Sequence, residues 1–239
     1  MLTDPKQHRY PYFALVYDTK DYEPSDPICG GILIAPDIVL SAAHCDGTKT
    51  PVDMVSVGKQ IIYSREAGAE EGFRVQQKIR HPAFTRKSYK GDVMLIKLDR
   101  ESKKPWIKLN SDSNFPSEDQ LLTAIGFGDT EPQFHREAVF PTRLMEVEVN
   151  YIADQELCKS QNQRRPVLPD MLCAASRNRD TCDGDSGGPL MIPKGQDGQL
   201  EDLLVGITSW GQGSCGRIKH PVSTICAVYN ASWSFIDSV

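Results

Sequence analysis

The sequence predicts an all-β protein made of two small β-barrels that lie side by side. Short apolar runs of strand length recur along the chain, with Gly, Pro, Asp and Asn clusters between them, and this pattern is typical of barrels and sandwiches. Long helical periodicity is scarce. A connector at residues 101–109 divides the runs into two groups of similar size. We therefore expect an N-terminal barrel over residues 1–108, a C-terminal barrel over 109–239 and a cleft at their junction.

The expected strands follow one another at short intervals. The run MEVEV at 145–149 alternates apolar and polar residues with period two, as a half-buried strand does. Two segments have a helical pattern: residues 152–160, with a start at Asp154, and residues 230–238 at the end of the chain. The expected strand segments are FALVY (13–17), GILIA (31–35), DIVLSAA (37–43), VMLIKL (93–98), LLTAIGF (121–127), MEVEVNYI (145–152) and DLLVGITSW (202–210).

Length and charge limit the classes of protein to consider. A chain of 239 residues can bury one large core or two small ones. Its net charge of −5 argues against a nucleic-acid binder, which usually has a basic face. No apolar run approaches the roughly 18 residues that cross a bilayer. The start, MLTDPKQHRYPYF, has neither the charged beginning nor the apolar middle of a signal peptide, a segment that processing removes from secreted proteins.

The seven cysteines indicate an oxidising compartment. They lack the paired short spacings of a zinc site, and no CxxC motif occurs. Three disulfides and one remaining thiol are therefore the simplest arrangement, which favours an extracellular protein. A bridge between Cys29 and Cys45 would hold the loop that carries His44. The cysteines are Cys29, Cys45, Cys158, Cys173, Cys182, Cys215 and Cys226.

Three short segments carry residues suited to acyl transfer. His44 lies in SAAHCD, Asp92 in KGDVMLIKL and Ser186 in TCDGDSGGPL. Acyl transfer needs a nucleophile, a base within reach of it, an acid that orients the base, and donors for the oxyanion. Glycines at 184 and 187 allow a tight turn around the serine, so the N–H groups of Gly184 and Ser186 could converge on a substrate oxygen. An isolated His or Asp is usually structural, but the combination with GDSGGP favours catalysis.

The order of these residues separates this site from other nucleophilic sites. Subtilisin-like enzymes have the order Asp, His, Ser, and α/β-hydrolases have Ser, Asp, His with a GxSxG elbow. Ser186 lies in DSGG, which is not that elbow, and no βαβ pattern surrounds it. A lipase or esterase is therefore disfavoured.

On these residues the chain resembles the chymotrypsin/trypsin-like serine peptidases. The motifs AAHC and GDSGGP are highly specific together, and the matching pieces keep the family's order along almost the whole chain. The resemblance implies two six-stranded antiparallel β-barrels packed side by side with a short C-terminal helix. The matching pieces are CGGILIAPDIVLSAAHC (29–45), GDVMLIKL (91–98), GFGDT (126–130), MLCAA (171–175), DTCDGDSGGPL (180–190) and VGITSWG (205–211).

The resemblance implies a role for each residue of the site. Ser186 would be the nucleophile, His44 the general base and then the general acid, and Asp92 the residue that orients the imidazole. Gly184 and Ser186 would form the oxyanion hole. Disulfides Cys158–Cys173 and Cys182–Cys215 would join Cys29–Cys45, the second of them tying the nucleophile loop to the SWG strand. No cofactor or metal is expected.

The resemblance also predicts the substrate. Asp180 lies six residues before Ser186, where trypsin-like members have a carboxylate at the floor of the pocket, so we expect cleavage after Arg or Lys. The partners would be protein or peptide substrates with Arg or Lys at the cleavage site and protein inhibitors, with no nucleic acid and no membrane, and the chain would be an extracellular monomer. The alternative is a zymogen-like or non-catalytic member that acts as a binding protein. The expected substrate-binding residues are Asp180, Thr181, Asp183, Ser209, Trp210 and Gly211.

The chain departs from the family at its start. Active members begin with a free Ile-Val-Gly-Gly-like terminus, whose ammonium pairs with the acid beside the nucleophile, here Asp185. This chain begins MLTDPKQHRYPYF instead. Because burying an isolated charge costs several kcal/mol, we expect Asp185 to turn outward and leave the oxyanion hole unformed. The chain as written would then be inactive although its triad is intact.

A second departure lies near the C-terminus. The segment HPVSTICAVYN (220–230) matches the family's pocket strand in two ways. One alignment puts Val222 at the pocket wall, where it would narrow the pocket, and the other puts Ala227 there with a smaller penalty. Cys226 has no partner in the family and is either a buried thiol or bonded to another chain. Asn230 begins a glycosylation sequon, Asn-Ala-Ser.

Overall fold

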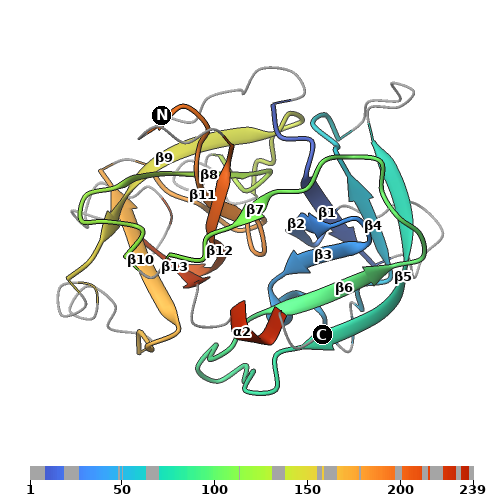
Figure 1. The fold of residues 1–239 in the computed structure, drawn as a ribbon, viewed down its shortest axis with the longest axis horizontal. Helices are drawn as coiled ribbons and strands as arrows, with labels where there is room; N and C mark the ends of the chain where they lie inside the picture. The colour runs from blue at the N-terminus through green and yellow to red at the C-terminus, as the bar shows by residue number, and fades with distance from the viewer. Residues whose placement is uncertain are drawn as a thin grey trace.

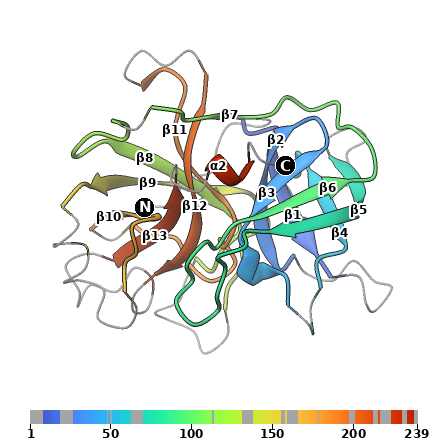
Figure 2. The same ribbon diagram turned by 60° about the horizontal axis from the view of Figure 1, so that its bottom comes forward.

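The structure, a computed structural model, confirms an all-β fold of two barrels side by side (Figure 1). Figure 2 shows the same arrangement from a second direction. Among the described residues, no helix is long and apolar enough to cross a bilayer. The described residues are 9–18, 27–47, 49, 51–62, 70–112, 114–130, 138–154, 158, 166–177, 179–196, 201–211, 215, 223–229 and 233–236.

Six strands form the first barrel, which is closed and antiparallel throughout. The strand order is β1-β2-β3-β6-β5-β4, and β1 closes the ring by pairing with both β2 and β4. Every residue of β1 is buried, and the core cluster that contains this strand also contains Ile125 and Phe127 of the second barrel. The strands are β1 (Phe13–Tyr17), β2 (Cys29–Ala35), β3 (Ile38–Ser41), β4 (Met54–Val57), β5 (Glu71–Arg80) and β6 (Met94–Leu98).

The second barrel also has six antiparallel strands, and it gains a seventh strand at one edge. Its order is β11-β8-β9-β10-β13-β12, with β11 and β12 paired to close the ring. The short β7 (Lys108–Leu109) pairs in parallel with the start of β12. This parallel pair was not predicted, and it forms where the connector between the barrels runs along β12. The six strands are β8 (Leu121–Gly126), β9 (Met145–Ile152), β10 (Met171–Ser176), β11 (Pro189–Ile192), β12 (Leu203–Gly211) and β13 (Ser223–Tyr229).

Burial follows the period of the strands. In β9 the alternation predicted for MEVEV is present: Val147 and Val149 are buried, and Glu148 between them is exposed. All four residues of β11 are buried: Leu190 and Ile192 belong to the second core, and Met191 belongs to the first. The division of the chain at residues 108 and 109 stays a prediction.

The C-terminal helix lies within the segment that has a helical pattern, and the rest of that segment is outside the described residues. Helix α2 spans Trp233–Ile236, and the edge of the Phe235 ring faces His81 of the first barrel, with the ring centroids 5.0 Å apart. Most of the helix expected at 152–160 lies outside the described residues. So does Asn230, which begins the sequon.

Candidate active site

His44 is held by a short 3-10 helix and a disulfide. Strand β3 ends at Ser41, and the 3-10 helix Ala43–Cys45 follows directly. Cys45 is bonded to Cys29 at the start of β2, so the loop cannot move away from the barrel. Ala43 and Cys45 are buried, while His44 keeps 15% of its side chain exposed. The imidazole is therefore fixed in place but accessible.

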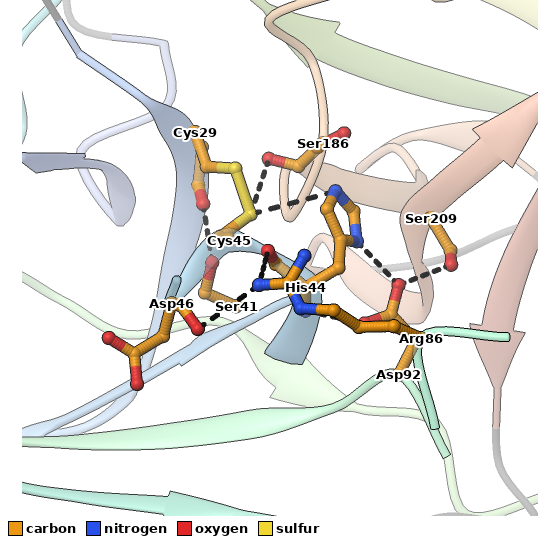
Figure 3. A network of polar contacts seen from close by, with 10 residues as sticks. Cys29, Ser41, His44, Cys45, Asp46, Arg86, Asp92, Ser186 and Ser209 are labelled. Carbon is orange, nitrogen blue, oxygen red and sulfur yellow. Dashed lines mark hydrogen bonds and ion pairs between the residues drawn. A yellow bond between two sulfur atoms is a disulfide. The ribbon is translucent and has the colours of Figure 1, made fainter. Parts of the chain in front are cut away.

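Asp92 lies wholly buried behind His44 and accepts three hydrogen bonds (Figure 3). Its Oδ1 accepts the backbone N–H of His44 at 2.8 Å, and its Oδ2 lies 2.7 Å from His44 Nδ1. The hydroxyl of Ser209 donates to the same Oδ2 at 2.5 Å. A proton held on Nδ1 by this carboxylate leaves Nε2 unprotonated, which is the state that a general base needs.

Ser186 lies at the tip of a turn that only glycines permit. Gly184 and Gly187 have φ angles of 102° and 78°, which side chains rarely adopt. A Cβ atom at Gly187 would also overlap Ser41 Oγ and Gly30 O. The carbonyl of Ser186 accepts the N–H of Gly30 at 2.8 Å. This contact joins the nucleophile turn of the second barrel to β2 of the first.

The structure brings Ser186 beside His44 without joining them by a hydrogen bond. His44 Nε2 lies 3.9 Å from Cys45 Sγ, which is itself 4.0 Å from the Ser186 carbonyl, and Figure 3 shows the serine next to the imidazole. Hydrogen bonds of this kind often tighten only when substrate binds. In the described part of the chain, the N–H groups of Gly184 and Ser186 donate to no protein acceptor, so both are available to an oxyanion.

Asp185 is turned inward, which contradicts the expectation of an outward-facing side chain. Its Oδ1 accepts the N–H of Gly128 at 2.8 Å, and its Oδ2 accepts the N–H of Cys182 at 2.8 Å. Burial raises the pKa of Asp185 to about 6, although both hydrogen bonds act in the opposite direction. Two backbone donors therefore replace the expected cation in part and keep the carboxyl group inside.

The glycines around Asp185 are what make room for it. A Cβ atom at Gly126 or at Gly128 would overlap the Asp185 carboxylate. A cavity of about 20 Å³ lies next to the carboxylate, and Met145 and Val147 form part of its wall. A space of this size holds one water molecule and not an aliphatic side chain.

The residues expected to bind substrate lie around this turn. Asp180 and Thr181 are half-buried and line the same small cavity as Asp185, while Asp183 is exposed. Ser209, Trp210 and Gly211 end β12. The structure therefore brings Ser209 to Asp92, and it places Asp180 beside the cavity next to Asp185.

The far wall of the pocket lies only partly within the described residues. Val222 is outside them. Ala227 is in β13, where the strand register sets it opposite Thr208. The same register sets Cys226 opposite Trp210, and Ile225 opposite Gly211. The choice between Val222 and Ala227 thus stays open.

All three implied disulfides are present. Cys182 is bonded to Cys215, and Cys158 to Cys173. The first fixes the chain four residues before Ser186. The group formed by Cys29, His44 and Cys45 has its atoms close enough for a metal, but both sulfurs are used by their disulfide and no thiolate is left to coordinate.

Sequence reasoning missed a charged cluster beneath His44. Asp46 is buried and bonded to Lys78 and Arg80 of β5 and to the N–H of Val52. Burial acts to raise the pKa of Asp46, but the two cations and the N–H outweigh it and hold the pKa below its usual value. Arg86 donates to the carbonyl of His44 at 3.0 Å. The spacing of the members of this cluster in the sequence does not indicate that they are in contact, because they meet only when β5 folds over the loop.

Tyr89 also went unnoticed in the sequence. Its ring centroid lies 5.1 Å from that of His44, and its φ angle of 59° is unusual for a residue with a side chain. The ring packs against the second-barrel cluster of Cys158, Val167, Met171 and Cys173. Tyr89 therefore fills the space between His44 and the second barrel.

Comparisons with known proteins identify the family of the chain. The family model described as Trypsin matches residues 3–234. Kallikrein-5 of Homo sapiens is 30% identical over 92% of this chain and 69% of its own length. Kallikrein-8 of Mus musculus is 35% identical over 81% of this chain and 70% of its own. Trypsin of Simulium vittatum is 34% identical over 81% of this chain and 74% of its own.

A solved structure shares the whole architecture. Neuropsin, a serine protease expressed in the limbic system of mouse brain, aligns with a TM-score of 0.81 and 28% identity, covering 99% of this chain and 97% of the other. The chain belongs to the trypsin family, and it is a serine endopeptidase by descent.

Proposed function

We propose that the chain is a secreted serine endopeptidase that cleaves peptide bonds after Arg or Lys through an acyl-enzyme on Ser186. The observation that carries the proposal is the pairing of His44 Nδ1 with buried Asp92 beside the glycine-rich Ser186 turn. A buried carboxylate of this kind has one clear use, which is to hold an imidazole in the tautomer and orientation of a base.

The chemistry proceeds in two steps. Ser186 Oγ attacks the scissile carbonyl while His44 Nε2 takes the hydroxyl proton, and the N–H groups of Gly184 and Ser186 stabilise the oxyanion. The C–N bond then breaks, and the amine leaves with the proton from His44. Water, deprotonated by His44, attacks the ester and releases the acid product, and the proton returns to Ser186. Asp92 stabilises the imidazolium in both steps.

Substrate selection would come from Asp180. Its carboxylate lies six residues before the nucleophile and beside the cavity next to Asp185, and a guanidinium or ammonium is the partner that a buried carboxylate prefers. The end of β12, from Ser209 to Gly211, would pair with the extended backbone of the substrate. Such backbone pairing selects an extended substrate whatever its side chains are. The preference for one kind of side chain would therefore come from Asp180.

Location and partners follow from the same features. The three disulfides favour an oxidising compartment and therefore secretion. We expect a monomer that meets protein substrates and protein inhibitors at one cleft.

Full activity would depend on a cation that pairs with Asp185. Its carboxylate is held by backbone donors alone among the described residues, and the neighbouring cavity of about 20 Å³ must widen before a terminal ammonium with an aliphatic side chain can enter. A zymogen-like state is thus the second candidate, because Asp185 has a partial substitute for its ion pair.

The test compares hydrolysis of a peptidyl-Arg amide with and without Ile-Val dipeptide, beside Ser186→Ala. We expect activity that rises with the dipeptide and is absent from Ser186→Ala. Faster cleavage of a peptidyl-Phe amide would contradict the assignment of Asp180. A chain that hydrolyses neither amide and is not labelled by a serine-reactive fluorophosphonate would be a binding protein.

A further inference from the structure

A second acid lies close to the catalytic loop but on the other barrel. Asp170 precedes β10, and its Oδ2 accepts the backbone N–H of Gly91 at 2.7 Å. Gly91 is the residue directly before Asp92, and 79 positions of chain separate it from Asp170. The hydrogen bond therefore ties the peptide that carries the catalytic acid to the second barrel.

The backbone at Gly91 is shaped to make this bond. Its φ angle is 58°, and a Cβ atom there would overlap the His81 imidazole. Gly91 is buried. Only a glycine can adopt this conformation so close to His81, and the conformation directs the N–H towards Asp170.

The other oxygen of Asp170 is not explained by a hydrogen bond, although the carboxylate does act electrostatically on His81. Oδ1 is buried and, within the described part of the chain, has no hydrogen-bond partner. Leaving a buried polar atom unpaired costs about 1–3 kcal/mol, so stability alone does not account for a carboxylate here. The bond that Oδ2 makes to Gly91 is charge-assisted, and such bonds are roughly twice as strong as neutral ones.

We propose that Asp170 is a positioning residue, which sets the Asp92 loop of the first barrel in register with the barrel that carries Ser186. The inference rests on the proposed triad. Among the described residues the loop meets the second barrel at Gly91, which donates to Asp170, at Asp92, which accepts from Ser209, and at Tyr89. Tyr89 packs against the apolar cluster that includes Met171 and Cys173 of β10. Ser209 orients the carboxylate, whereas Asp170 fixes the backbone from which that carboxylate extends.

The position of one barrel relative to the other matters because the triad residues are divided between them. His44 and Asp92 come from the first and Ser186 from the second. A displacement of about 1 Å in such an arrangement can lower the rate by about 100-fold. Removing the Asp170 bond should therefore act on the chemical step and leave substrate affinity almost unchanged.

The experiment uses Asp170→Ala, Asp170→Asn and Glu118→Ala, which removes an exposed acid of the same barrel. The activity assay contains peptidyl-Arg amide and Ile-Val dipeptide, and hydrogen exchange of the Gly91 amide reports the bond directly. For Asp170→Ala we expect kcat to fall by about 10- to 100-fold with KM within about 3-fold, and Gly91 exchange to accelerate by at least about 10-fold. Asp170→Asn, which keeps an acceptor oxygen, should recover kcat to within about 5-fold of the wild type.

The outcomes separate this inference from the proposed function. Faster Gly91 exchange with unchanged kcat would overturn the positioning role, and so would a loss of kcat that Asp170→Asn does not restore or that Glu118→Ala reproduces. A wild-type chain with no activity and no fluorophosphonate labelling would overturn the triad, and with it the inference.

Discussion

Two carboxylates next to the reaction centre differ in how completely they are satisfied. Asp92 is held by three donors, and two of these come from side chains, His44 and Ser209. Asp185 has two backbone donors and, among the described residues, no cation. In the proposed site, the half that would activate Ser186 is thus assembled. The half that would shape the pocket contains a carboxyl group with a raised pKa.

Asp46 shows how a neighbouring cation changes the pKa of a buried carboxyl group. Burial acts to raise the pKa of both Asp46 and Asp185, and it prevails only at Asp185. At Asp46 the charges of Lys78 and Arg80 reverse the direction. The two carboxyl groups therefore have opposite protonation tendencies: Asp46 has two cations among its partners, and Asp185 has none among the described residues.

The largest expected effect comes from breaking the assembled half. Asp92→Asn keeps the size of the side chain but presents an amide to His44 and favours the wrong tautomer. We expect kcat for a peptidyl-Arg amide to fall by about 10⁴-fold, the loss known for the triad acid in this family. Circular dichroism should show the fold unchanged, and a loss below about 10-fold would contradict the role of Asp92.

The next largest effect is the change with pH in the contribution of Asp185 to stability. Its pKa in the folded state, about 6, is above the usual value of 3.8, so its contribution to stability is present below pH 3.8 and is lost as pH rises through 6. A shift of about two units corresponds to about 3 kcal/mol. The stability of Asp185→Asn relative to the wild type should therefore rise between pH 4.5 and 7.5.

Denaturant unfolding at several pH values measures this difference. The hydrogen bond that the Asn amide fails to accept lowers stability equally at every pH, so the slope is diagnostic. Ile-Val dipeptide should cancel the wild-type loss at pH 7.5, and acetylated Ile-Val, which lacks the ammonium, should not. If the difference in unfolding free energy between Asp185→Asn and the wild type did not change with pH, the charge of Asp185 would not destabilise the folded protein.

A smaller effect comes from filling the space around Asp185. Gly126→Ala puts a Cβ atom against the carboxylate, which must then shift and lose a backbone donor. We expect a loss of about 2 kcal/mol in unfolding free energy, as for other overpacked sites. Gly72→Ala is the matched control, because no atom lies within 4 Å of its added Cβ, and thermal unfolding of both variants checks the contrast.

The smallest effect comes from weakening the Asp46 cluster. Lys78→Ala removes a cation whose Nζ lies 2.7 Å from Asp46 and whose side chain is 27% exposed, so we expect a loss of about 1 kcal/mol at pH 7. The pKa of Asp46 is lowered, so this stabilisation is present above pH 3.8 and is lost as pH falls below it. Lys97→Ala, from the more exposed Lys97–Asp37 pair, should cost less, and equal losses would show that burial of Asp46 adds nothing.

The sequence by itself predicted the strand segments of β1, β2, β3, β6, β8, β9 and β12, the two groups of strands and the catalytic motifs. It did not predict β4, β5, β10, β11 and β13 as strands. Alternation in MEVEV and the short apolar runs depend on neighbouring residues, so they can be read locally. His44, Asp92 and Ser186 each lie in a distinctive segment, and the resemblance carried by those segments gave the cysteine pairs. Local signals were sufficient because each reports on a turn or a strand only a few residues long.

Only the tertiary structure decided how the carboxylates are satisfied. Asp185 turned inward because Gly126 and Gly128 leave room for it and backbone N–H groups face it. Asp170 reaches Gly91 across 79 positions of chain, and Arg86 reaches His44 across 42. Such contacts have no local signature, because the free energy of a buried charge depends on whichever distant groups the fold brings within hydrogen-bond distance.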